Sequence, residues 1–90
     1  MMQNKLAQLL KDAGWVHRST DRLENGSEVY EFDNGKHKCV SVYADMIFLS
    51  GQGFNGTVIS LYFEHISYCY QNKGTLHICM DKAGCLSFDR

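Results

Sequence analysis

Four histidines and four cysteines are the residues of this 90-residue chain best suited to chemistry. Two His-x-Cys pairs stand out, His37 with Cys39 and His77 with Cys79. Residues two apart in a strand share a face, so two such pairs on neighbouring strands could offer four ligands to zinc. Zinc sites usually hold their ligand pairs in tight turns such as Cys-x-x-Cys, which this sequence lacks. We therefore expect no metal and no cofactor, although the spacing leaves zinc binding open.

Nucleophilic catalysis would need a cysteine with a histidine base within hydrogen-bond reach. His65 and Cys69 would meet only if their segment were helical, and the nearby Ile66, Tyr68 and Tyr70 favour a strand instead. No cysteine lies in a sequence context that would activate its thiol. The sequence therefore predicts no catalytic residue and a protein that is not an enzyme.

A glycine-rich segment at residues 51–58 fits the pattern G-x-G-x-x-G-x-V and resembles the glycine-rich loop of protein kinases. The dinucleotide-binding version of the pattern requires a helix directly after the third glycine, but residues 57–63 are β-branched and aromatic. The lysine, catalytic Asp and metal-binding Asp contexts of a kinase are missing. The segment is therefore predicted to be a flexible loop between two strands.

The elements that must position these residues are one helix and a series of strands. Apolar residues at three- and four-residue steps predict a helix from Gln3 to Ala13 with residues 3–5, 8, 11 and 12 on its polar side. Gly14 should end this helix, and Trp15 should fold back against Leu10. The strands are expected at residues 16–20, 28–33, 36–43, 46–49, 57–63, 66–70, 75–80 and 85–88.

This order predicts an α+β fold, with one N-terminal helix packed on a twisted antiparallel meander of about five to seven short strands that could curl toward a half-barrel. An Asn-Gly turn at residues 34–35 predicts a two-residue hairpin. That turn would set Asp33 opposite Lys36 and Glu31 opposite Lys38, which pairs opposite charges across the strands. Residues 1–90 are expected to form a single domain.

Composition and charge restrict the classes of partner. Nine basic and ten acidic residues give a formal net charge of -1, and no block of like charge occurs. A phosphate backbone is therefore an unfavourable partner. No stretch approaches the roughly 20 apolar residues that a membrane span needs, and the first residues lack the layout of a secretory signal. The expected location is the cytoplasm, or the host cytoplasm for a viral protein.

The cytoplasmic expectation bears on the cysteines, because disulfides are rare in that compartment. All four, Cys39, Cys69, Cys79 and Cys85, are predicted to be reduced and to act as small hydrophobic residues. A four-residue loop at 81–84 would place Cys79 opposite Leu86, in the core. The aromatic residues Tyr62, Phe63, Tyr68 and Tyr70 could form a stacking platform for single-stranded nucleic acid, but few cations lie near them, so core packing is favoured.

A protein partner is the function class that remains. Phe54 lies in the glycine-rich loop as a candidate interface anchor, with Gln52 and Asn55 beside it; the alternative is that Phe54 folds back onto the core. A free sheet edge could also pair two copies of the chain into a homodimer. In size and in its lack of catalytic motifs, the chain resembles the small proteins with which phages and other mobile elements block host defences, anti-CRISPR proteins included. That resemblance implies an inhibitor, immunity or adaptor protein; the alternative is a zinc-stabilised or nucleic-acid-associated accessory domain.

Overall fold

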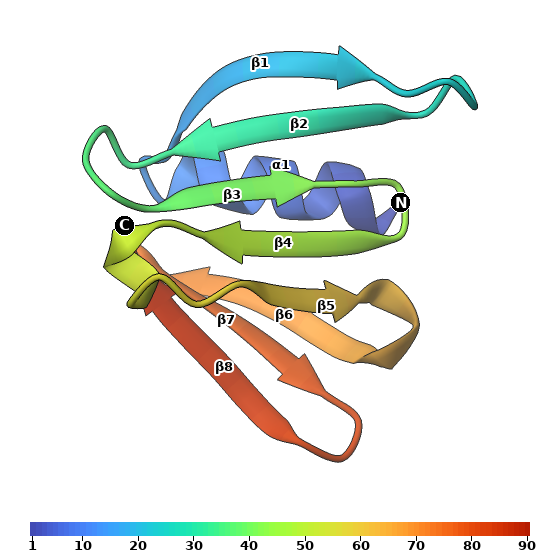
Figure 1. Ribbon diagram of the computed structural model, residues 1–90. Coiled ribbons are helices and arrows are strands. Elements are labelled where there is room, and N and C mark those ends of the chain that lie inside the picture. The colour runs from blue at the N-terminus through green and yellow to red at the C-terminus, as the bar shows by residue number, and fades with distance from the viewer.

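A computed structural model describes residues 1–90 and contains one helix and eight strands in two antiparallel sheets (Figure 1). The elements are α1 (Met2–Asp12), β1 (Val16–Arg22), β2 (Glu28–Asp33), β3 (Cys39–Val42), β4 (Met46–Ser50), β5 (Ile59–Tyr62), β6 (Ile66–Asn72), β7 (Thr75–Met80) and β8 (Gly84–Asp89), with 3-10 helices η1 (Gln52–Phe54) and η2 (Phe63–His65). Strands β1–β5 form one sheet in chain order, and β6–β8 form the other. The predicted α+β meander is confirmed, and no barrel closes.

The end of α1 follows the local signals in the sequence. Gly14 has φ +92°, which glycine adopts without the steric cost of a Cβ. The Trp15 N–H then donates to the Leu10 carbonyl at 2.9 Å and the Gly14 N–H to the Lys11 carbonyl at 3.0 Å. These two bonds satisfy carbonyls that the helix end leaves free, and they turn Trp15 back toward the core. The predicted helix end is confirmed.

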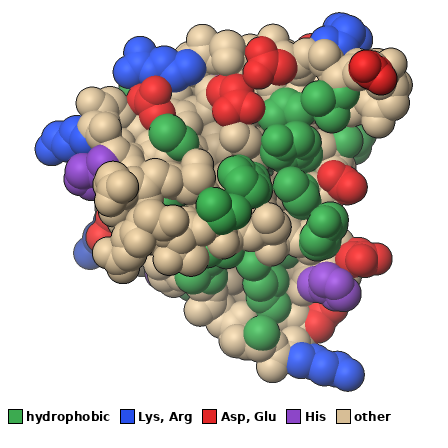
Figure 2. All heavy atoms as spheres, viewed as in Figure 1, with side chains coloured by type: hydrophobic (Ala, Val, Ile, Leu, Met, Phe, Trp, Pro, Cys, Tyr) green, Lys and Arg blue, Asp and Glu red, His purple; other side chains and the backbone are tan.

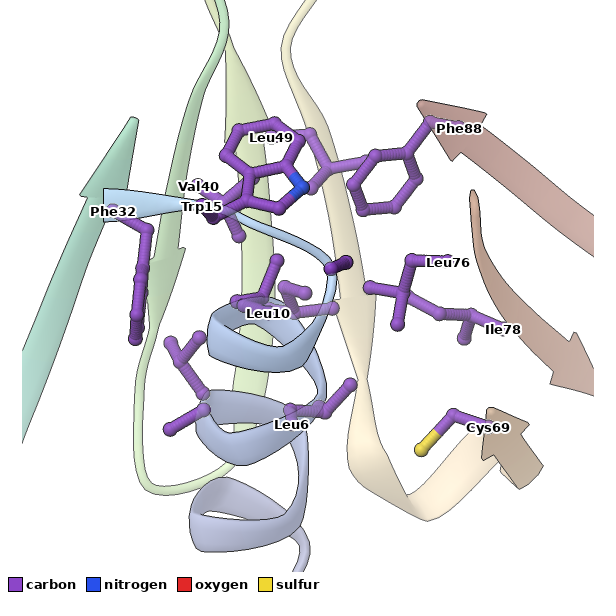
Figure 3. Close-up of a cluster of buried hydrophobic side chains, with 14 of the residues drawn as sticks. Leu6, Leu10, Trp15, Phe32, Val40, Leu49, Cys69, Leu76, Ile78 and Phe88 are labelled. Carbon is purple, nitrogen blue, oxygen red and sulfur yellow. The ribbon is translucent and has the colours of Figure 1, made fainter. Parts of the chain in front are cut away.

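The core lies where the inner faces of the two sheets meet around α1. Figure 3 shows Leu6 and Leu10 of the helix between Phe32 of the larger sheet and Ile78 of the smaller one. Trp15 is 4% exposed, and its ring packs edge-to-face on Phe88 with centroids 5.8 Å apart. Burial of the apolar side of α1 against the inner faces of both sheets stabilises the fold.

Gln3 corrects the predicted polar side of the helix. Its side chain is buried, and its amide nitrogen donates to the carbonyl of Glu28 at 2.6 Å and to that of Val42 at 3.1 Å. A buried polar group of this kind is stable because both hydrogen bonds are made. Gln3 therefore ties the first turn of α1 to the start of β2 and the end of β3.

The predicted two-residue hairpin between β2 and β3 is wrong. Asp33 lies opposite Cys39, so residues 34–38 form a five-residue loop. The side-chain oxygen of Asn34 accepts hydrogen bonds from the backbone N–H groups of Lys36, His37 and Lys38 at 2.9, 3.0 and 3.0 Å. The loop is therefore wider than a two-residue Asn-Gly turn. Its backbone N–H groups donate to the Asn34 side chain rather than to carbonyls of the opposite strand.

The new register also changes the partners of the acidic residues in β2. The Asp33 carboxylate accepts a hydrogen bond from the Arg18 guanidinium of β1 at 2.8 Å. Glu31 accepts one from the Ser41 hydroxyl of β3 at 2.7 Å. The charge pairs predicted between β2 and the lysines of the loop are therefore absent.

Candidate functional site

The glycine-rich loop after β4 is packed against the β2–β3 loop. The Gly53 N–H donates to the His37 carbonyl at 2.9 Å. A Cβ added at Gly51 would overlap the His37 carbonyl oxygen, and one at Gly53 would overlap the His37 ring and the Lys38 side chain. The segment lies between strands β4 and β5 as predicted, and these two glycines allow it to approach the β2–β3 loop closely.

The three predicted contact residues of this loop differ in exposure. Phe54 is half-buried, with its ring edge-on to Phe88 at a centroid distance of 5.6 Å and the Lys38 ammonium 5.4 Å from its centroid. Gln52 and Asn55 are exposed. Phe54 thus contributes to the core in this structure, while contact of all three residues with a partner stays a prediction.

The two His-x-Cys pairs lie on different sheets. His37 is in the β2–β3 loop and Cys39 begins β3, whereas His77 and Cys79 are on β7. The chain holds no group of three or more His, Cys, Asp or Glu side chains arranged to bind a metal ion. Cys39 is exposed and free. The spacing that suggested zinc ligands therefore does not bring the four side chains into one site.

Cys79 forms a disulfide with Cys85, so the prediction of reduced cysteines is wrong for these two residues. The loop between β7 and β8 contains residues 81–83, one fewer than predicted, and this register sets Cys79 opposite Cys85 with their Cα atoms 3.9 Å apart. A one-residue change of register exchanges every cross-strand partner, which is why Leu86 is not opposite Cys79.

Cys69 lies in the core and has no base beside it. Its thiol is buried, and its sulfur contacts the Met2 sulfur at 3.7 Å. Burial raises the pKa of the Cys69 thiol, so the reactive thiolate is disfavoured. His65 is exposed in η2 with its ring nitrogen 3.5 Å from the Glu64 carboxylate. The arrangement supplies neither an activated thiol nor a base oriented toward it.

The outer face of the β6–β8 sheet carries a row of stacked rings. Tyr68 and Tyr70 are 54% and 44% exposed, with near-parallel rings whose centroids are 6.0 Å apart. Tyr70 also stacks on His77 at 4.6 Å, and the His77 Nδ1 lies 2.6 Å from the Ser87 hydroxyl. Because Cys69 points into the core, alternation along β6 directs its two tyrosine neighbours outward.

This outward placement corrects the predicted burial of the aromatic residues. Core packing is wrong for Tyr62, Tyr68 and Tyr70, which are all exposed, and right for Phe63, which packs partly buried against the core. No ion pair lies within this row, and Lys73 is in the turn after β6. Stacking surfaces for single-stranded nucleic acid combine such rings with a positively charged groove, which this face lacks.

The outer face of the larger sheet carries a second apolar area, which we call the outer-face strip. It consists of Tyr43, Met46, Phe48 and Tyr62. None of the four belongs to the core or packs against it. Met46 lies opposite Tyr62 on the neighbouring strand, and the Tyr43 N–H donates to the Met46 carbonyl at 2.8 Å across the β3–β4 turn. Figure 1 looks onto this face with α1 behind the sheet, and Figure 2 shows hydrophobic side chains gathered on it.

Sequence reasoning missed the outer-face strip, although one signal for it was present. Residues 46–49 are an uninterrupted apolar run, which is typical of a strand that places apolar side chains on both faces. Ile47 and Leu49 fill the core, so Met46 and Phe48 face the opposite side. The second face of the run is thus apolar, and its residues Met46 and Phe48 are partly exposed.

The Arg18–Asp33 pair is the clearest electrostatic feature of this face. A hydrogen bond from Arg18, with a second from the Gly35 N–H, lowers the pKa of the Asp33 carboxyl. The same contact raises the pKa of Arg18. The side chains are 54% and 28% exposed, so the pair lies in solvent and is screened by salt.

No protein-family model, no curated protein and no solved structure matches this chain. No helix of the protein is long and apolar enough to cross a membrane.

Proposed function

We propose that this protein is a small, non-enzymatic module that binds another protein, of the inhibitor, immunity or adaptor type. The observation that carries the proposal is the outer-face strip of Tyr43, Met46, Phe48 and Tyr62, in which Tyr62 is 49% exposed and the other three are partly exposed. Tyrosine, phenylalanine and methionine are the residue types enriched at the centres of protein interfaces. Met46, Phe48 and Tyr62 lie on strands β4 and β5, so little backbone entropy is lost there when a partner binds.

The accessory-domain alternative has less support. A zinc-stabilised domain needs converging ligands, and a nucleic-acid-associated domain needs cations along its aromatic face; the residues of this chain meet neither requirement. The phage and anti-CRISPR type remains a proposal based on likeness in size. A cytoplasmic location also remains a prediction, and the Cys79–Cys85 disulfide fits an oxidising compartment better.

Two copies of the chain could pair through a sheet edge, but the structure of edge strand β1 disfavours this proposal. The free edge strand β1 changes register between His17 and Ser19 and is exposed along its whole length. Bulges and charged side chains of this kind are common devices that prevent edge-to-edge pairing. The face of the sheet is therefore a better candidate for binding than this edge.

The proposal is tested by quantitative affinity capture from cells of the source organism with matched variants. Tyr62→Ser, in the strip, should reduce the captured partner at least about tenfold, the usual effect of removing a central aromatic contact. Tyr70→Ser, which removes a similarly exposed tyrosine from the other sheet, is the control and should retain the partner.

Two further variants test the predicted loop contact. Gln52→Ala and Asn55→Gly change exposed loop side chains, and Asn55 has φ 60°, which glycine tolerates. If these variants lose the partner while Tyr62→Ser keeps it, the binding surface is the loop. If no protein is captured by the unmodified chain, or if every variant captures it equally, the proposed function is wrong.

A further inference from the structure

Acidic side chains lie around the outer-face strip. Asp21 of β1 and Glu31 and Asp33 of β2 are on the same outer face, as the alternation with buried Phe32 requires. Two more acidic residues, Asp45 in the β3–β4 turn and Glu64 in η2, line a surface hollow together with Tyr62 of the strip. Figure 2 shows Asp and Glu side chains around the hydrophobic ones on this face, and Lys and Arg side chains only near its outline.

Little positive charge balances this rim. Of the nine basic residues, Arg18 is the one whose ion pair lies on this face, and it binds Asp33 at 2.8 Å. Glu31 accepts a hydrogen bond from a neutral hydroxyl, so its charge is not neutralised. Asp21 and Asp45 are exposed and make no ion pair. A near-neutral chain therefore presents an apolar strip inside a negative field.

We propose that the outer-face strip binds a protein surface that carries lysine and arginine around an apolar or aromatic projection. This inference rests on the proposed function and names the chemistry of its partner. The apolar projection would cover Phe48 and Tyr62, while the basic side chains would reach the rim carboxylates. A complementary rim of this kind raises the association rate and selects among partners of similar shape.

The same charge pattern argues against other occupants. A second copy bound face to face would bring acidic rim against acidic rim, because a two-fold interface uses the same patch on both chains. Nucleic acids and anionic lipid surfaces are also negative and would be repelled. A protein surface with basic residues around an apolar projection is complementary to both the apolar centre and the acidic rim.

Two matched peptides test the inference by nuclear magnetic resonance titration of the isotope-labelled protein. One peptide alternates leucine with lysine, and the other has glutamate at every lysine position. Each exposed charge pair is worth about a twofold change in affinity, and glutamate in place of lysine exchanges one attraction for one repulsion, or about fourfold. Three such positions should therefore favour the lysine peptide about sixtyfold, or about 2.5 kcal/mol. The shifted signals should come from β3–β5, and the preference should shrink at high salt.

Charge reversal supplies a matched pair of variants. Asp45→Lys should lower the affinity for the lysine peptide about fourfold, because one attraction is replaced by one repulsion. Asp12→Lys makes the same change of charge at the end of α1, behind the sheet, and should leave the affinity unchanged.

Three results would overturn the inference. If both peptides shift the β3–β5 signals with equal affinity, the strip binds proteins without charge selection, and the proposed function stands without a basic partner. The basic partner is likewise excluded if Asp12→Lys weakens binding as much as Asp45→Lys. If neither peptide shifts signals of β3–β5, the strip does not bind such chemistry, and the capture experiment with Tyr62→Ser decides the proposed function separately.

Discussion

Replacement of Gly51 by alanine tests whether the glycine-rich loop exists for packing between two loops. Gly51 has φ 108° and ψ 169°, a region that is essentially restricted to glycine and costs other residues about 1–3 kcal/mol. The added Cβ would overlap the His37 carbonyl oxygen and lie 3.2 Å from its carbonyl carbon. Both are backbone atoms that cannot rotate away, so the β2–β3 loop must move, at an overpacking cost of about 1–3 kcal/mol. Gly51→Ala should therefore lower the free energy of unfolding by about 2–6 kcal/mol.

Gly56→Ala is the matched control in the same loop. Gly56 has φ 69°, and a Cβ there would have no atom within 4 Å. The substitution should cost about 1–2 kcal/mol, the ordinary penalty of a left-handed conformation, with no clash. Gly51→Ala is thus predicted to cost about 1–3 kcal/mol more than Gly56→Ala, because the overpacking cost remains once the shared backbone penalty is removed.

Urea unfolding followed by tryptophan fluorescence measures both variants, with free energies from linear extrapolation. If Gly51→Ala and Gly56→Ala differ by less than about 0.5 kcal/mol, the packing of the loop on His37 is not what requires the glycine. A phosphate-binding role predicts a different outcome, in which both variants fold normally and binding of a nucleotide such as ATP is lost.

Trp15→Ala should lower the free energy of unfolding by about 3–5 kcal/mol, since a large buried ring is removed; a loss below about 1 kcal/mol in urea unfolding would contradict the packing of the helix end. Phe54→Ala should cost about 1–3 kcal/mol, less than full burial would, because the ring is half-buried against Phe88; an unchanged melting temperature would show that Phe54 does not belong to the core. The pKa of Asp33 is lowered in the folded state, so its stabilising effect is complete above the ordinary carboxyl pKa and is lost as the pH falls through the lower folded-state value. Asp33→Asn should therefore flatten the acid side of the curve of unfolding free energy against pH, and an unchanged curve would show that the Arg18 contact does not persist in solution.

Much of the fold could be predicted from the sequence because it depends on local signals. The helix, its end at Gly14 and the turn of Trp15 toward Leu10 follow from residue spacing and from one glycine within a few residues. Alternation of apolar and polar residues predicted an antiparallel meander in the same way. The apolar run of residues 46–49 also indicated that both faces of this strand are apolar. It did not indicate which of the two faces would lie outside the core.

The tertiary structure alone decided strand register, cysteine pairing and the exposure of the tyrosines. Asn34 could serve a tight turn or accept three backbone N–H groups, and the choice depends on the register in which β2 meets β3. A loop of four residues would place Cys79 opposite Leu86. The observed loop is one residue shorter and places Cys79 opposite Cys85, with which it forms a disulfide. When a strand has apolar residues on both faces, its own sequence does not determine which face the helix covers. That choice is made when α1 packs between the two sheets, because burial there is gained for one face of each sheet and the other remains in water.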